Sequence, residues 1–210
     1  MWALVDDADN VTEIIAHPKS LIIDDIRHPK KIFSAWTDAE KRAIGLYEVT
    51  PASKFDESYY INSNASYAKV GTKVVETITK VADKALADVN EVDENGDPLL
   101  DDDGVQVVTL GLKSNAKNKA TAQANGYLQG FEWLIARKVT ANTAIPSAIT
   151  TYMAAIRTDH GNICTALDAA SDMDAFIALH TTTYNEDRTV NVIAKTQSWT
   201  SDANVKAYRR

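Results

Sequence analysis

Hydrophobic and polar positions follow two different periods along the chain. In the first half, short apolar runs alternate with turn-forming Asp, Asn, Pro and Gly, which is typical of β-hairpins. In the second half, apolar residues recur every three or four positions, the spacing of amphipathic helices. The pattern predicts an α+β fold with a β-rich module at residues 1–89, an acidic linker at 90–104 and a helical module at 105–210.

The β-rich module is predicted to consist of short hairpins with one short helix. Thr37 and Glu40 have the spacing of a capping box, and the helix that they begin should end at Gly45. The segment from Val81 to Val89 has a spacing that allows a second short helix, and a strand is expected at Lys73 to Thr79. The expected strand pairs are Trp2–Val5 with Val11–Ile15, Leu21–Ile23 with Ile26–His28, and Tyr59–Ile61 with Tyr67–Val70.

Three helical segments are predicted between Leu110 and Leu179, with breaks at Glu132-Trp133 and at Ala144 to Ser147. The first, about Leu110 to Leu128, has an Ala-rich face that would let a partner helix approach closely. The helix that begins near Pro146 has the clearest apolar stripe. That stripe consists of Ile149, Tyr152, Met153, Ile156, His160, Ile163 and Leu167.

The last predicted helix begins at Ser171, which can cap it. The residues that mark its buried face are Met173, Phe176, Ile177 and His180. A short strand from Thr189 to Ala194 is expected to follow a turn. The C-terminal module is therefore predicted as three helices and a short terminal strand.

Composition narrows the classes of partner. The net charge of −7 and the pI near 5.1 argue against nucleic acid as the main partner, because phosphate binding requires clustered Lys and Arg. No run approaches the roughly 18 apolar residues of a membrane span, and the first residues lack the pattern of a signal peptide. We expect a protein made in a cytoplasm, without a membrane partner and without an internal disulfide, since Cys164 is the one cysteine.

The acidic segment invites comparison with a calcium-binding loop. Asp93, Asn95 and Asp97 occupy the first, third and fifth positions of such a loop. Pro98 then stands where glycine should make the sharp turn, and Gly104 stands where a bidentate Glu should close the site. We therefore expect a solvated acidic loop, with neither a metal nor a cofactor.

Catalytic motifs are not evident in the sequence. His160 and Cys164 lie four residues apart on one helical face, which could represent a base and a nucleophile, but a structural pair is the favoured interpretation. The eight glycines form neither a P-loop nor a dinucleotide fingerprint, and no serine lies in a Gly-x-Ser-x-Gly elbow. We expect a protein that is not an enzyme. The alternative is a cell-surface hydrolase acting through His160 and Cys164 or through the acidic loop.

Large aromatic residues suggest where another protein could bind. Trp133 lies at a predicted helix break and Tyr152 on the central stripe, and such residues often form hot spots where chains meet. Simple packing within the core remains the other interpretation. The candidate protein-contact residues are Trp133, Tyr152, Ile156, Trp36 and Tyr127.

Two parts of the chain resemble proteins encoded beside tail-fibre genes of bacteriophages, particularly marine and cyanobacterial ones. The N-terminal motifs that carry the resemblance are Met1 to Val5, His28 to Phe33, Trp36 to Glu40, and Ile44 to Tyr47. The C-terminal motifs, which resemble tail-assembly chaperone-like and tail-fibre-assembly proteins, are Gly126-Tyr127-Leu128, Glu132-Trp133, Ile145-Pro146-Ser147 and Tyr152 to Arg157. This chain departs from the pattern in having Glu132 for Asp and Met153 for Arg, and Lys73 to Val107 has no counterpart.

The resemblance implies a non-enzymatic structural protein of the virion, located in the tail, baseplate or tail-fibre region. It also implies that the partners are other phage tail or fibre proteins, within an oligomer in a larger assembly. The alternative is a tail-fibre assembly chaperone that is not retained in the virion.

Overall fold

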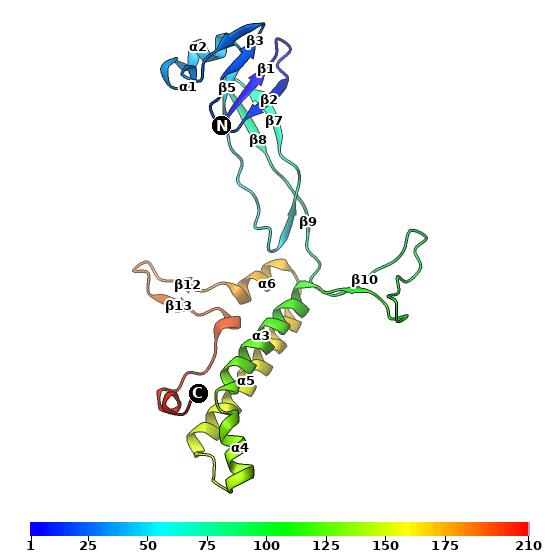
Figure 1. Cartoon of the computed structure of the whole chain (residues 1–210), viewed down its shortest axis with the longest axis vertical. Coiled ribbons are helices and arrows are strands. Elements are labelled where there is room, and N and C mark those ends of the chain that lie inside the picture. The colour runs from blue at the N-terminus through cyan, green and yellow to red at the C-terminus, as the bar shows by residue number, and fades with distance from the viewer. Residues whose placement is uncertain (210) are drawn as a thin grey trace. The chain divides into compact units, whose positions relative to one another are not determined.

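The computed structural model describes residues 1–209, and the chain divides into two compact units, Met1–Asp83 and Lys84–Arg210 (Figure 1). The fold is α+β, as predicted, with hairpins in the first unit and mainly helices in the second. The acidic segment was expected to be a linker at 90–104, but it lies inside the second unit. It pairs with itself and is anchored to a helix, as described below, so it is a structural part of that unit.

Five strands form the central sheet of the first unit, in the order β2-β1-β5-β8-β7. They are β1 (Trp2–Val5), β2 (Val11–Ile15), β5 (Leu46–Thr50), β7 (Ser66–Val70) and β8 (Lys73–Thr77). β5 and β8 run parallel, while the other neighbours are antiparallel. Because side chains alternate along a strand, β1 places Trp2 and Leu4 against one cluster of buried residues and Ala3 and Val5 in another.

The sheet packs apolar residues on both faces. One cluster lies under helix α1 (Ile32–Ala35) and the hairpin of β3 (Leu21–Ile23) and β4 (Ile26–His28), and it consists of Ile15, Leu21, Ile32, Phe33 and Leu46. The other cluster consists of Ala3, Val5, Val49 and Val74. The first two predicted hairpins are confirmed at their predicted residues.

Helix α2 (Asp38–Ala43) begins with the predicted capping box. The Thr37 amide donates to the Glu40 carboxylate at 2.7 Å, and the Glu40 amide donates to the Thr37 hydroxyl at 3.3 Å. Gly45 follows the helix with a φ of 74°, and a Cβ there would lie 2.6 Å from the Val5 carbonyl oxygen. Glycine is therefore required both by the backbone conformation and by the close approach of β1.

Two predictions for this region are wrong. The expected partner of Tyr67–Val70 was Tyr59–Ile61, but β7 pairs with β8 across the turn at Gly71. β6 (Tyr60–Asn62) instead pairs with β9 (Lys80–Asp83), and this pairing also replaces the helix expected from Val81 to Val89. The tight glycine turn is the shorter connection, and the strand at Tyr60 then takes the next strand in the chain as its partner.

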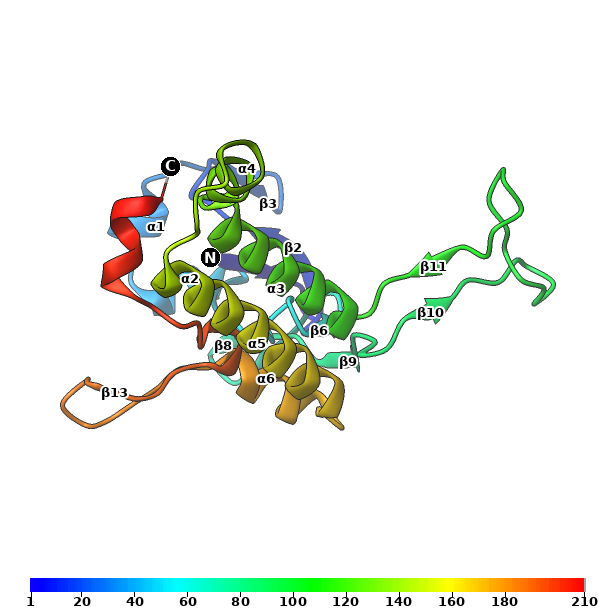
Figure 2. The same cartoon turned by 90° about the horizontal axis from the view of Figure 1, so that it is seen from below.

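The second unit is organised around an antiparallel pair of long helices, α3 (Leu112–Gln129) and α5 (Ser147–Ala169) (Figures 1 and 2). The predicted Ala-rich face of α3 is confirmed, because Ala116, Ala120 and Ala124 are buried. The predicted stripe of α5 is buried at all of its positions except the half-buried His160. Short side chains on α3 let the two helix axes approach closely.

The described residues of this unit contain four α-helices, one more than expected. The first break is at Gly130-Phe131, so Glu132 and Trp133 begin helix α4 (Glu132–Ala141) instead of interrupting a helix. Asn142 ends α4 in the left-handed conformation, with a φ of 50°. Helix α6 (Met173–His180) begins after Asp172, whose carboxylate accepts the Ala175 amide at 2.8 Å.

The last described residues return to the long helices. β12 (Thr183–Tyr184) and β13 (Val190–Val192) form a hairpin around the predicted turn, and two 3-10 helices, η1 (Lys195–Gln197) and η2 (Ala203–Tyr208), follow. Val205 enters the main core, and the Trp133 indole donates to the Tyr208 carbonyl at 2.9 Å. Arg209 donates to the Gly126 carbonyl at 3.0 Å, so this segment is fastened across the junction of α3 and α4.

Candidate interaction surfaces

An acidic hairpin, which we call the acidic arm, spans residues 89–109. It begins with β10 (Val89–Asn90), ends with β11 (Val108–Thr109), and projects from the start of α3 (Figures 1 and 2). Between these strands the chain makes two further turns, closed by bridges between Val92 and Pro98 and between Leu100 and Gln106. The segment expected to be a loop is therefore a folded double hairpin.

The two turns of the acidic arm have the same construction. In the first, the Asp93 carboxylate accepts the amides of Asn95 at 2.8 Å and Asp97 at 3.0 Å. In the second, the Asp101 carboxylate accepts the amides of Asp103 at 3.0 Å and Val105 at 2.9 Å. Gly96 and Gly104, each three residues after its Asp, have positive φ angles of 89° and 77°. The eight-residue spacing of Asp-x-x-Gly therefore encodes two tight Asx turns.

A single side chain holds the strands of the acidic arm together. The Gln106 side-chain amide lies 2.7 Å from the Glu91 carbonyl oxygen, 3.0 Å from that of Val107 and 3.1 Å from that of Leu99. Backbone amides complete the arrangement, since Leu99 donates to Glu91 and Val107 donates to Leu99. The arm consequently has fixed hydrogen bonding without a hydrophobic core of its own.

The acidic arm is anchored where α3 begins. The amides of Gly111, Leu112 and Lys113 belong to the first turn of a helix, which has no partners within the helix. They donate to the Asp88 carboxylate at 2.8 Å, the Ala85 carbonyl at 2.9 Å and the Leu86 carbonyl at 3.1 Å. The Ser114 hydroxyl donates to the same carboxylate at 3.0 Å. The hydrogen bonds from Gly111 and Ser114 lower the pKa of Asp88, so the carboxylate acts as a charged N-cap.

The surface of the acidic arm combines exposed apolar groups with negative charge. Among residues 89–109, which the structure describes in full, none is buried. The arm contains seven acidic residues and neither Lys nor Arg. Its exposed large aliphatic side chains are Val89, Val92, Leu99, Leu100, Val105 and Val108. An apolar surface held in a fixed conformation and left in solvent is typical of a protein interface.

A second surface lies at the opposite end of α3. A groove of about 540 Å³ runs between α3, α4 and α5, and we call it the helical groove. Leu128, Ile135 and Met153 supply its apolar walls, and Glu132 and Arg157 supply its charges. Beside it, Val139 of α4 is 79% exposed and lies one turn from Ile135, which is 42% exposed. Helix α4 therefore leaves an apolar face uncovered within the described residues.

The side chains predicted to contact another protein lie mainly within the chain. Ile156 is 0% exposed and Tyr152 is buried, and both belong to the core formed with Phe131 and Ile149. Tyr127 is half-buried against Trp199, at 5.4 Å between ring centroids. The central stripe of α5 is thus filled by the chain itself.

The two tryptophans of the predicted set are also half-buried. Trp133 packs against the core of the second unit and is hydrogen-bonded to Tyr208. Trp36 belongs to the first unit, where its ring meets His28 edge to face at 5.6 Å. The sequence did not identify the acidic arm or α4 as surfaces. For the arm, the sequence does contain a signal, because aliphatic residues stand on both sides of each Asp-rich turn.

His160 and Cys164 form a polar contact between the long helices. The His160 Nε2 atom lies 3.0 Å from the Thr121 hydroxyl of α3 and 3.5 Å from the Cys164 sulfur. Burial raises the pKa of the Cys164 thiol, which disfavours the thiolate that a nucleophile requires. The geometry matches a hydrogen-bonded pair at the edge of the helix interface.

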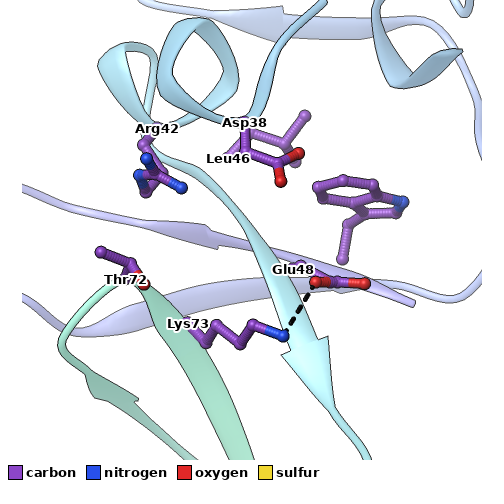
Figure 3. A pocket seen from close by; sticks show the side chains of 7 residues that line it. Asp38, Arg42, Leu46, Glu48, Thr72 and Lys73 are labelled. Atoms are coloured by element: carbon purple, nitrogen blue, oxygen red, sulfur yellow. Dashed lines mark ion pairs between the residues drawn. The ribbon is translucent and has the colours of Figure 1, made fainter.

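A small polar pocket lies over the sheet of the first unit (Figure 3). Its volume is about 120 Å³, whereas ligand pockets commonly measure about 300–1,000 Å³. Lys73 and Glu48 form an ion pair of 3.2 Å across neighbouring strands at its floor. Its lining residues are Trp2, Asp38, Arg42, Leu46, Glu48, Thr72 and Lys73. The pocket is therefore smaller than most ligands, and two of its charged groups, Lys73 and Glu48, neutralise each other.

Residues 1–209 contain no group of three or more His, Cys, Asp or Glu side chains arranged to hold a metal ion. In the acidic arm, the amides of Asp97 and Asn95 occupy the Asp93 carboxylate and lower its pKa. None of the helices in the described chain is long and apolar enough to cross a membrane. No family model matches the chain, and neither a curated protein nor a solved structure matches it.

Proposed function

We propose that this chain is a non-enzymatic structural subunit of a bacteriophage virion, in the tail, baseplate or tail-fibre region, where it acts through contacts with other proteins. The observation that carries the proposal is the acidic arm, an ordered hairpin with six exposed aliphatic side chains and no buried residue. The resemblance of the terminal motifs to proteins encoded beside tail-fibre genes supports the phage assignment.

The construction of the arm supports a role in assembly. Two Asx turns, Gln106 and the Asp88 anchor fix the backbone, so binding would not incur the full entropic cost of ordering a flexible loop. The hairpin of β12 and β13 likewise exposes Tyr184, Val190 and Val192. Projecting hairpins with apolar side chains suit a subunit whose neighbours cover them in an assembly.

Mass spectrometry of purified phage particles tests the proposal. We expect the protein at a fixed copy number relative to known tail proteins, and unchanged after further density-gradient purification. Loss of the protein during purification would contradict a structural role. A fibre protein that is recovered in soluble form only when this chain is co-expressed would then favour the assembly chaperone.

A further inference from the structure

We infer that the acidic arm of one chain binds the helical groove and the exposed face of α4 on a second copy of the same chain. The inference rests on the proposed structural role and names the partner of the arm. It predicts a head-to-tail contact, in which each copy offers one arm and one groove.

Charge complementarity is the first argument for a second copy as the partner. The arm has seven acidic residues without a basic one, whereas α4 and the groove lining have three basic residues, Arg137, Lys138 and Arg157, and one acidic residue, Glu132. Within the described residues, neither Arg137 nor Lys138 of α4 forms an ion pair. The same chain thus has an acidic surface on the arm and a complementary basic surface at α4.

The apolar groups also match. The arm exposes Leu99 and Leu100 between its two Asx turns, and α4 exposes Ile135 and Val139 beside the groove. The arm comprises 21 residues, close to the 20–30 residues that each partner commonly contributes to a stable interface. Each surface therefore combines an apolar centre with charged groups around it.

The arm cannot reach the groove of its own chain. It joins α3 at Gly111, whereas Leu128 lies at the far end of that helix and Ile135 lies beyond it in α4. Since α3 has 18 residues, the two ends are about 27 Å apart, and the arm points away from α4 (Figure 2). The contact therefore joins different copies and is heterologous, which produces a closed ring or an open filament.

Sedimentation velocity of the full chain tests the inference with two interface variants. Leu99→Ser with Leu100→Ser changes the arm, and Ile135→Asp with Val139→Asp changes the exposed face of α4. We expect the wild-type chain to form oligomers and each variant to be monomeric, with a dissociation constant raised at least about tenfold. Ile22→Ser in β3 is the matched control, because Ile22 is 72% exposed and lies outside both surfaces, and this variant should assemble as the wild type does.

Mixing the two variants provides the sharper result. The arm variant keeps an intact groove, and the groove variant keeps an intact arm, so an equimolar mixture should form dimers with one chain of each kind. Monomers in the mixture would overturn the inference, as would assembly of either variant alone at wild-type strength. Circular dichroism of each variant verifies that it is folded.

Salt and phage particles separate this inference from the proposed function. Because charges of opposite sign meet, raising NaCl from 50 to 500 mM should weaken wild-type assembly at least about tenfold. A wild-type chain that stays monomeric at 100 μM would overturn self-assembly, even if the protein is found in particles. Assembly through arm and groove by a protein that is absent from particles would instead overturn only the tail role.

Discussion

Gly111 is the residue at which the acidic arm joins helix α3, and it leaves no room for a side chain. A Cβ on Gly111 would lie 2.3 Å from the Ala87 carbonyl oxygen. We expect Gly111→Ala to lower the free energy of unfolding by about 1–3 kcal/mol, measured by urea denaturation. Gly126 is a control in the same helix, because a Cβ there meets nothing within 4 Å. Gly126→Ala should raise the free energy of unfolding by about 0.5–1 kcal/mol. Equal effects of the two changes would contradict this account.

Asp88 should make stability depend on pH. Hydrogen bonds from the Gly111 amide and the Ser114 hydroxyl hold its pKa below the ordinary value of 3.8. A carboxyl whose folded-state pKa is lowered stabilises the fold fully above its unfolded-state pKa, and this contribution is lost as the pH falls through the folded-state pKa. Asp88→Ala should therefore lower the Tm at pH 7, and its difference from wild type should shrink as the pH falls below 3.8.

The measurement for Asp88 is thermal unfolding of wild type and Asp88→Ala, followed by circular dichroism between pH 7 and pH 3. Asp102→Ala is the matched control, because Asp102 lies in the exposed acidic arm and its carboxylate forms no hydrogen bond within residues 1–209. Its Tm should stay at the wild-type value. A difference between Asp88→Ala and wild type that is constant with pH would show that the carboxylate charge is not involved.

Sequence reasoning at the residue scale succeeded where the interacting partners are close in the chain. Thr37 and Glu40 are three residues apart, and the capping box that they predict is present. Asp88 was missed, because its partner Gly111 is 23 residues away, and no local pattern connects a carboxylate to a helix that begins so much later. Capping across that distance requires knowledge of how the arm folds back.

The strands of the acidic arm are joined by three hydrogen bonds from one side chain, that of Gln106. We expect Gln106→Ala to increase hydrogen exchange at the amides of Glu91, Leu99 and Val107 about tenfold, since a net hydrogen bond contributes about 0.5–1.5 kcal/mol. Mass spectrometry of exchange in the full chain measures this. Gln123→Ala on the exposed side of α3 should leave those amides unchanged. Unchanged exchange in Gln106→Ala would mean that the turns alone hold the arm.

Predictions at the element scale differed between helices and strands. The positions of α3 and α5 were predicted because their apolar residues repeat over several turns. Helix α4 was missed as a separate helix, since Ile135 and Val139 face solvent and leave no one-sided stripe toward the core. The strand at Tyr60–Asn62 was found, but its partner was wrong, because alternation identifies a strand without identifying its neighbour.

For the whole molecule, the spacing of apolar residues is the same whether a helix face packs inside the chain or against another chain. Tyr152 and Ile156 were candidates for protein contact, and both fill the core of the second unit. The surfaces now proposed for contact differ from that core stripe, because their apolar side chains are exposed and are interspersed with charged residues. Exposed apolar side chains such as Leu100 and Val139 became visible as a surface only when burial was known.

The separation of core and arm predicts that the arm can be removed without loss of the fold. Replacing residues 90–108 by two glycines deletes no buried residue, and a shorter connection lowers the entropic cost of closing it. The free energy of unfolding of this variant should therefore stay within about 0.5 kcal/mol of wild type, or rise, while assembly is lost. Urea denaturation followed at 222 nm gives the first quantity, and sedimentation velocity gives the second. A large loss of stability in the monomeric variant would mean that the arm packs on its own chain, because an arm that serves only a neighbour contributes to stability only in the assembled state.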